Sequence, residues 1–242
     1  MKYEKFDKYD KGKYLQAYFE KDKEFYNAIK QHMATELRKK QTVGIDIGAG
    51  PGIGARLAFS LDLNTNLIGY EPSATWRDGK KLADEIARAK GVMEYTSLKK
   101  SIQEINISQK NAFDYILVLR AAHEIAASLG SKGEFFREMK RISKGLKRGG
   151  VLILADHQFK NAKIRPSVLK KIQEYQQQKI GHSHIPSDYI HKEKAKQIFW
   201  KQGLDLTKET TMFDKKLSVY LRKQGIKEKN PTFFYIQTYK KQ

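Results

Sequence analysis

The segment VGIDI (residues 43–47) leads into a loop with four glycines in seven residues, GAGPGIG (48–54). Glycine lacks a Cβ atom and adopts positive φ angles readily, so such a loop turns sharply and lets a ligand approach the backbone. If a helix starts directly after the loop, its free N–H groups face the same ligand. The spacing therefore predicts a strand, a ligand-binding loop and a helix, with Asp46 near the end of the strand.

A second acidic residue, Glu71, ends the segment NLIGYE (66–71). A carboxylate at the end of a neighbouring strand can accept hydrogen bonds from both hydroxyls of a ribose. Two classes of cofactor contain such a ribose, so Glu71 alone does not choose between them. Glu71 therefore predicts a nucleoside-containing ligand at the glycine loop.

The spacing of the loop itself separates the two classes. The dinucleotide fingerprint G-x-G-x-x-G/A can be placed on Gly50, Gly52 and Ala55. The pattern D-x-G-x-G-x-G, which starts at Asp46, fits better. The stretch DIGAGPG resembles the first motif of the class I S-adenosylmethionine-dependent methyltransferases nearly letter for letter. Three further stretches resemble the same family in the same order: LIGYEPS, NAFDYILVLRAAHEI and LKRGGVLILADH.

This resemblance spans residues 43 to 157, about half of the chain. It implies an α/β fold with a Rossmann-like, doubly wound, seven-stranded sheet that is mostly parallel with an antiparallel last strand. It also implies S-adenosyl-L-methionine as the cofactor. The positions that match the family's cofactor motifs are Asp46, Gly48, Ala49, Gly50, Glu71, Pro72, Ser97, Leu98 and Arg120. Many relatives carry Asp after the third strand to hold the adenine amine. Here YTSLKKS stands there, so we expect Ser97 to substitute while Leu98 packs on the adenine ring.

The elements that must position these residues follow from hydrophobic patterning. Apolar segments separated by helical segments predict a parallel sheet covered on both faces. We expect strands at 43–47, 66–71, 92–96, 113–119, 151–156, 204–213 and 233–239, and helices at 22–38, 52–61, 73–90, 134–147 and 188–202. The 134–147 helix opens with the capping-box pair Ser131 and Glu134, and we expect it to stop at Gly149-Gly150.

The domain organisation predicted from this pattern has two parts. An N-terminal helical cap covers residues 1–40, and a methyltransferase domain covers 41–242, with 158–187 as a lid or insertion. Two tyrosines, Tyr14 and Tyr18, precede the first strand. The resemblance implies that this region caps the active site, while core packing of an amphipathic helix is the simpler account of the tyrosines.

The catalytic candidates are His123 and His157, which follow the fourth and fifth predicted strands. The sulfonium donor is already activated, so the protein has mainly to align the reactants. A hydroxyl acceptor gains from a nearby base, and a histidine has a suitable pKa. The alternative for either histidine is a packed or hydrogen-bonded structural role. Arg120 could also hold an anionic group of the substrate, although its backbone alone would pass the cofactor.

Three histidines, His182, His184 and His191, lie close together in GHSHIPSDYIH. Metal binding is one interpretation of such a cluster. The resemblance argues against it, because metal-dependent methyltransferases of this fold use carboxylates at the end of strand four, where Arg120 stands. We therefore expect no metal site, and these histidines are either lid contacts to the substrate or exposed loop residues.

Composition limits the setting of the protein. The 242 residues contain no Cys, and no apolar run approaches the roughly 20 residues of a membrane span. The N-terminus lacks the apolar region of a signal peptide, so we expect a cytoplasmic protein without a membrane partner.

The net charge is +20, of which residues 158–242 carry +12. Only 10 of the 47 basic residues are Arg. This favours a lysine-biased surface over a nucleic-acid surface, because phosphate and base recognition favour Arg.

Three functions remain open, and the first is favoured: methyl transfer to an O or N atom of a small molecule. The second is RNA methylation at ribose or a base nitrogen. Base C5 methylation needs a Cys, and the motif after strand four that is typical of adenine N6 methylation is replaced by LRAAHE. The third is a binding module that keeps the cofactor fold without turnover. Lys223, Lys227 and Lys229 are expected between the last two strands, far from the donor methyl. The sequence leaves the acceptor and the oligomeric state open.

Overall fold

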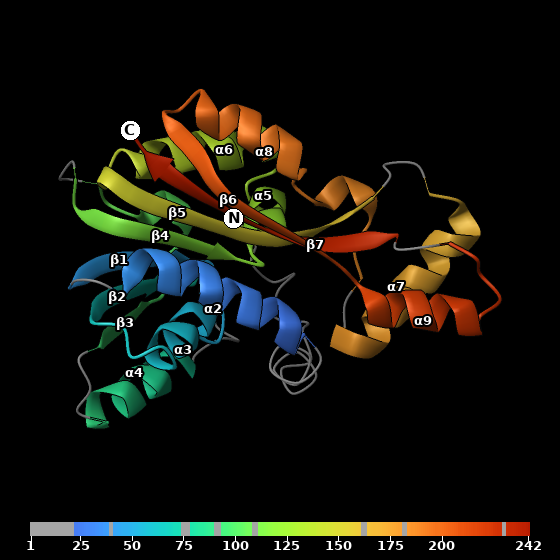
Figure 1. The fold of residues 1–242 in the computed structure, drawn as a ribbon, viewed down its shortest axis with the longest axis horizontal. Coiled ribbons are helices and arrows are strands. Elements are labelled where there is room, and N and C mark those ends of the chain that lie inside the picture. Colours follow the sequence, from blue (N-terminus) through green and yellow to red (C-terminus); the bar gives the residue numbers. More distant parts are fainter. Residues whose placement is uncertain are drawn as a thin grey trace.

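The computed structural model describes residues 22–38, 41–73, 78–89, 93–107, 111–160, 164–180, 183–228 and 231–242. Seven strands form one sheet in the order β3-β2-β1-β4-β5-β7-β6 (Figure 1). The strands are β1 (Thr42–Ile47), β2 (Thr65–Tyr70), β3 (Glu94–Leu98), β4 (Phe113–Leu119), β5 (Leu146–Phe159), β6 (Leu204–Phe213) and β7 (Thr232–Lys241). All seven predicted strands are present, with ends that differ from the prediction by several residues in some cases.

The pairing of the strands fixes where a ligand can bind. Strand β1 runs parallel to β2 and β4, and β4 runs parallel to β5. Strand β7 is antiparallel to both β5 and β6, which confirms the predicted doubly wound, mostly parallel, Rossmann-like sheet. The strand order reverses between β1 and β4. In open α/β sheets the ligand lies beside such a switch point, at the carboxyl ends of the strands.

Helices cover both faces of the sheet (Figure 1). One face carries α2 (Lys23–Leu37), α3 (Ile53–Phe59) and α4 (Asp78–Arg88), and the other carries α5 (Ala122–Ser128), α6 (Lys132–Ser143) and α8 (Lys192–Trp200). Each layer buries an apolar stripe, represented by Ile29 and Met33 on α2 and by Phe135 and Met139 on α6. The core therefore lies in two layers, one on each side of a buried sheet.

Helix α2 belongs to this core, because it packs against α3, β5, β6 and β7. The proposed cap over residues 1–40 is thus described only from residue 22 onward, and its Tyr14 and Tyr18 lie outside the described residues. Among the described residues, no helix combines the length and the apolar character that a membrane span requires.

One predicted helix end is wrong. Helix α6 begins after Ser131, whose hydroxyl accepts a hydrogen bond from the Glu134 N–H as the capping pair predicted (3.1 Å). The helix ends at Ser143 rather than at the glycine pair. Gly149 and Gly150 lie inside β5, where the pairing with β4 changes register. The glycines mark a bulge in a strand instead of the end of a helix.

Helices α5, α7 (Pro166–Ile180) and α9 (Lys215–Lys223) were not predicted. Helices α7 and α9 pack on each other through a small core of their own that includes Val168, Ile172, Leu217 and Leu221. In Figure 1 they lie together, apart from the helices that cover the sheet. The segment 158–187, predicted as a lid or insertion, contains α7.

The position expected for the connection between the last two strands is also wrong. Strand β6 is antiparallel to β7 and therefore runs in the same direction as β5. The connection through α9 leaves β6 at the carboxyl edge, the same edge as the glycine loop. Lys223 is the last residue of α9, and Lys229 lies outside the described residues.

Candidate active site

The glycine loop forms the strand-to-helix turn that its spacing predicted. Gly48, Gly50 and Gly52 have φ angles of 68°, 52° and 78°, in the left-handed region that favours glycine. A Cβ atom on Gly48 would lie 2.5 Å from the Ala121 Cβ, and one on Gly52 would lie 2.4 Å from a Leu82 methyl. A Cβ on Gly50 would meet nothing within 4 Å. Gly50 is therefore the point where the loop is open to a ligand.

Asp46 supports this loop from beneath. Its side chain is buried, and Oδ2 accepts a hydrogen bond from the Gly54 N–H at the start of α3 (3.2 Å). Burial raises the pKa of Asp46 to about 7; the Gly54 N–H opposes this rise, and nearby Glu71 adds to it. Asp46 was predicted among the cofactor-binding residues, and the structure places it behind the loop, where it holds the first turn of the helix.

Glu71 lies directly against the loop, just after β2. Its Oε2 accepts a hydrogen bond from the Gly50 N–H (2.9 Å), and its Oε1 accepts one from the Ser73 N–H (2.9 Å). Pro72, between Glu71 and Ser73, is partly exposed. The carboxylate is half-buried and so remains within reach of a ligand at Gly50.

The carboxyl end of β3 is hydrogen-bonded to the segment after β2, beside the glycine loop. The Glu71 N–H donates to the Leu98 carbonyl (3.0 Å), and the N–H groups of Gly48 and Ala49 both donate to the Tyr70 carbonyl (2.9 and 3.1 Å). Ser97 and Leu98 are partly buried. The structure thus brings most of the predicted cofactor positions together along the carboxyl ends of three adjacent strands.

Arg120 contributes its backbone to this edge and turns its side chain elsewhere. Its φ angle of 58° is unusual for a residue with a side chain, and its N–H donates to the Ala155 carbonyl (2.6 Å). The guanidinium donates to Asp22 at the start of α2 (2.7 Å), and Lys179 of α7 donates to the same carboxylate (2.7 Å). Burial would raise the pKa of Asp22, but these two cations outweigh it and hold that pKa below its usual range.

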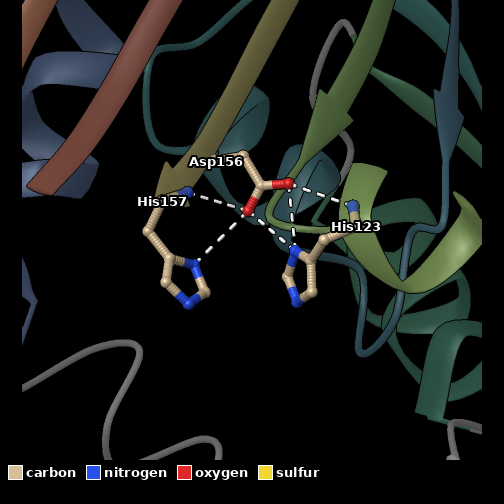
Figure 2. A group of neighbouring side chains, drawn as sticks. All are labelled: His123, Asp156 and His157. Carbon is tan, nitrogen blue, oxygen red and sulfur yellow. Dashed lines mark hydrogen bonds and ion pairs between the residues drawn. The ribbon is translucent and has the colours of Figure 1, made fainter. Parts of the chain in front are cut away.

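The predicted catalytic residues His123 and His157 meet at one buried carboxylate, Asp156 (Figure 2). The His123 Nδ1–H donates to Asp156 Oδ1 (2.8 Å), and the His123 backbone N–H donates to Oδ2 (3.1 Å). The backbone N–H of His157 donates to Oδ1 (2.8 Å), and its Nδ1 lies 3.3 Å from that oxygen. Strand β5 and the first turn of α5 therefore fix the three side chains.

The electrostatics of the two histidines differ. Burial would lower the pKa of His123, but the Asp156 carboxylate outweighs it and raises that pKa above its usual value. Burial lowers the pKa of His157 to about 4, so this imidazole is neutral at pH 7. Burial would raise the pKa of Asp156 too, but the interaction with His123 outweighs it and keeps the carboxylate ionised.

Three residues from the segment before α8 and from α7 enclose this group. His157 Nε2 shares a hydrogen bond with the Tyr189 hydroxyl, and the Tyr189 hydroxyl also accepts one from Gln176 (3.4 Å). The His184 ring packs perpendicular to that of His123, with centroids 4.7 Å apart. His184 is buried, while His191 is partly exposed and lies next to Gln158, and His182 lies outside the described residues.

Sequence reasoning named His184 but missed Tyr189, Gln176 and Glu124 as neighbours of the histidines. Gln176 lies on α7, a helix whose Gln- and Lys-rich sequence shows only sparse apolar spacing, and Tyr189 lies in the segment before α8. Glu124 directly follows His123, and its Oε1 lies 3.8 Å from the His123 Nε2. The sequence shows that Glu124 follows His123, but only the structure shows that the two side chains point toward each other.

When His123 is neutral, the Asp156 carboxylate holds its proton on Nδ1 and Nε2 presents a lone pair. This nitrogen is buried and has no hydrogen-bond partner among the described residues. The arrangement suits an imidazole that accepts a proton or binds an electrophile.

No protein-family model matches the sequence, and a search among curated proteins found no match. Solved structures do match in fold. A putative sarcosine dimethylglycine methyltransferase from Galdieria sulphuraria superimposes with a TM-score of 0.56 at 16% identity, covering 94% of this chain and 87% of the other. The cyclopropane synthase MmaA2 from Mycobacterium tuberculosis gives a TM-score of 0.62 at 15% identity, covering 89% and 84%.

A third match is the Haemonchus contortus phosphoethanolamine N-methyltransferase 2 in complex with phosphomonomethylethanolamine and S-adenosylhomocysteine. It gives a TM-score of 0.59 at 17% identity, covering 88% of this chain and 52% of the other. At this level of identity the likeness identifies the fold, which is the class I S-adenosylmethionine-dependent methyltransferase fold. The three matched proteins differ in the activity that they are named for, so fold alone does not specify an acceptor.

Proposed function

We propose that the protein is an S-adenosylmethionine-dependent methyltransferase that acts on an O or N atom of a small molecule. The observation that carries the proposal is the junction of Gly50 and Glu71 at the switch point of the sheet. Within the part of the chain that the structure describes, the space beside Gly50 is open, and the adjacent carboxylate can accept hydrogen bonds from the ribose hydroxyls. Ser97 and Leu98, at the end of the next strand, are suited to line the adenine.

The backbone at Gly50 and the adjacent Glu71 carboxylate suit the cofactor in their hydrogen-bonding chemistry. The sulfonium would supply the activated methyl group, and the chain would align it with the acceptor. The tight contact of Gly48 with Ala121 fixes the loop against the turn after β4. That turn leads directly into His123. The glycine loop and the candidate base are therefore both held by the turn after β4.

His123 is the proposed proton acceptor for a hydroxyl substrate. Asp156 orients its ring and supports the charge that forms when Nε2 takes a proton. His157 is the proposed positioning residue, since its neutral ring is hydrogen-bonded to Tyr189 and borders a cavity with Arg120 and Lys179.

A small acceptor is supported by the cavities at the carboxyl edge. One pocket of about 380 Å³ lies between the start of α2 and the start of α9. Its charged lining is balanced and includes Asp22, Glu24, Asp214, Lys23, Lys215 and Lys216. A pocket of a few hundred Å³ fits a metabolite, and an open basic trough would be expected for RNA.

The experiment has two steps. Calorimetry with S-adenosylmethionine, S-adenosylhomocysteine and NAD should show binding of the first two, with a rise in melting temperature by mass action. NAD binding without S-adenosyl binding would refute the cofactor. Labelled S-adenosylmethionine is then incubated with a metabolite extract and, separately, with RNA. Label in the extract supports the proposal, label in RNA alone supports the alternative, and binding without any transfer supports a binding module.

A further inference from the structure

We propose that His123, Glu124 and His184 form a binding site for a divalent transition-metal ion, with Zn²⁺ as the representative ion. The proposal concerns metal binding alone and stands whether or not the chain transfers methyl groups. It departs from the expectation that the chain has no metal site. That expectation considered only the residue at the end of β4 and could not show that His184 folds back onto α5.

The geometry places three ligand atoms together. One donor atom from each of the three side chains lies within 4.8 Å of the others. The His123 Nε2 is 3.8 Å from the Glu124 Oε1, and the rings of His123 and His184 are perpendicular with centroids 4.7 Å apart. Tetrahedral zinc with ligands at about 2.0–2.2 Å holds its ligand atoms roughly 3.3–3.6 Å apart. Side-chain movements of about 1 Å or less would therefore complete the site.

A second observation points to a ligand. The His123 Nε2 is buried and lacks a hydrogen-bond partner among the described residues. Leaving such a nitrogen unsatisfied costs free energy, so buried polar atoms of this kind usually have a partner or a functional reason. This nitrogen lies on the side of the ring that faces Glu124.

A carboxylate accepts the other ring N–H of His123, and a second carboxylate lies near the His184 ring. Asp156 accepts the proton of His123 Nδ1 at 2.8 Å, and Asp188 Oδ2 lies 3.7 Å from His184 Nδ1. Metal-binding histidines typically donate their other ring N–H to a carboxylate, which fixes the ring and makes the free nitrogen a better ligand. The Gln176 side chain accepts a hydrogen bond from the His184 backbone N–H (3.0 Å) and anchors that residue further.

The other candidate group, His123 with Asp156 and His157, is less suitable. Both oxygens of Asp156 already accept hydrogen bonds from backbone or ring N–H groups. A metal ion there would have to displace the proton on His123 Nδ1. The group with Glu124 instead uses the free nitrogen and leaves these hydrogen bonds in place.

The ligand set also indicates the class of ion. Two imidazoles and one carboxylate suit Zn²⁺ and similar transition metals, whereas Mg²⁺ and Ca²⁺ prefer oxygen ligands. Three protein ligands leave a fourth position open. A bound ion would occupy the nitrogen that the proposed base uses, so metal binding and proton acceptance exclude each other at His123 Nε2.

The test uses the full chain without an affinity tag, treated with a chelator and dialysed. Calorimetric titration with ZnCl₂ should show one site with a dissociation constant below about 1 µM, and Co²⁺ should give visible absorption bands of a four- or five-coordinate ion. Glu124→Gln and His184→Asn should each weaken Zn²⁺ binding at least tenfold. His191→Asn, which changes a partly exposed histidine outside the group, should stay within twofold.

Folding of each variant is checked by circular dichroism and thermal melting. Glu124 is partly exposed, so Glu124→Gln keeps the test decisive if His184→Asn fails to fold. The proposal is overturned if the wild type binds Zn²⁺ no more tightly than about 100 µM. It is also overturned if a folded Glu124→Gln binds as tightly as the wild type.

Discussion

Asp156 is the residue on which the candidate site depends. Its two oxygens accept the backbone N–H groups of His123 and His157 and the ring N–H of His123. The carboxylate is fully buried, so its charge is stabilised by these donors rather than by water. One residue at the end of β5 therefore determines the orientation of a residue at the start of α5.

The first prediction concerns this carboxylate. Asp156→Asn keeps the shape but points an amide NH₂ at groups that are themselves donors. We expect the free energy of unfolding to fall by about 1–3 kcal/mol, the scale of a buried unsatisfied polar group. Urea denaturation measures it, with Asp62→Asn at an exposed turn as the matched control. An unchanged midpoint in Asp156→Asn would show that the carboxylate does not hold the histidines.

The second prediction concerns Glu71 and depends on the proposed cofactor. Glu71→Ala removes the acceptor for the ribose hydroxyls, and we expect S-adenosylhomocysteine affinity to drop by about 2–3 kcal/mol, the scale of charged hydrogen bonds. Calorimetry measures the dissociation constant. Glu94→Ala, at the opposite end of neighbouring β3, should bind like the wild type. An unaltered constant in folded Glu71→Ala would remove this residue from the site.

At the scale of elements, α2 joins the core to the carboxyl edge. Asp22 at its start accepts hydrogen bonds from Arg120 and Lys179, while His32 in its middle contacts both β6 and β7. The two ring nitrogens of His32 are hydrogen-bonded to the hydroxyls of Thr238 (2.7 Å) and Thr210 (2.9 Å). Burial lowers the pKa of His32 to about 4, and the charge of Lys208 acts in the same direction.

The third prediction is the pH dependence that this histidine imposes. An unfolded histidine binds its proton below about pH 6.5, whereas folded His32 stays neutral down to about pH 4. Its contribution to stability is therefore complete above pH 6.5 and is lost as the pH falls toward 4. Between pH 7.5 and 5, the wild type should lose about 2 kcal/mol more unfolding free energy than His32→Leu. Urea denaturation at both values tests this, and equal losses would contradict it.

The elements differ in how far their sequences predicted them. Strand β4 is buried along its whole length and β5 is buried from Gly150 onward, so their apolar runs were visible, and the loop after β1 was specified by its glycine spacing. Helices α7 and α9 were missed because they bury few residues, mainly against each other, and the rest of their length is polar. The glycine pair in β5 was misread because a bulge and a helix end need the same residue type.

The same limit applies to the candidate site. His123 follows β4, and Asp156 and His157 lie near the carboxyl end of the adjacent parallel strand β5, so their meeting could be predicted from topology. Tyr189 and His184 come from the segment before α8 and are hydrogen-bonded to Gln176 of α7, and no local sequence pattern encodes these contacts. The directions of Arg120 and Asp46 were also hidden, since each depends on which neighbour its buried charge finds.

At the scale of the whole molecule, the direction of β6 decides what surrounds the carboxyl edge. Because β6 runs parallel to β5, α9 and its lysines lie on the same edge as the glycine loop. The basic C-terminal third is therefore nearer to the candidate site than its sequence position indicated. Acidic side chains such as Asp22 and Asp214 accompany the lysines in the pocket there, so the excess charge is not concentrated on one surface of that pocket.

The last prediction separates a small-molecule enzyme from an RNA enzyme through this charge. A protein that uses 6–10 phosphate contacts loses roughly 10³–10⁵ in affinity between 50 and 200 mM salt. With its lysine bias and its balanced pocket, this chain should bind RNA only weakly, with a dissociation constant of about 1–100 µM at physiological salt and equally for unrelated sequences. Filter binding with three unrelated RNAs at both salt concentrations measures this, and S-adenosylhomocysteine calorimetry at the same salts serves as the control for intact protein.

Nanomolar binding to one RNA, with a salt dependence of that steepness and discrimination against the others, would reassign the acceptor to RNA. Weak binding with no preference would leave the pocket between α2 and α9 as the place to search for a small acceptor.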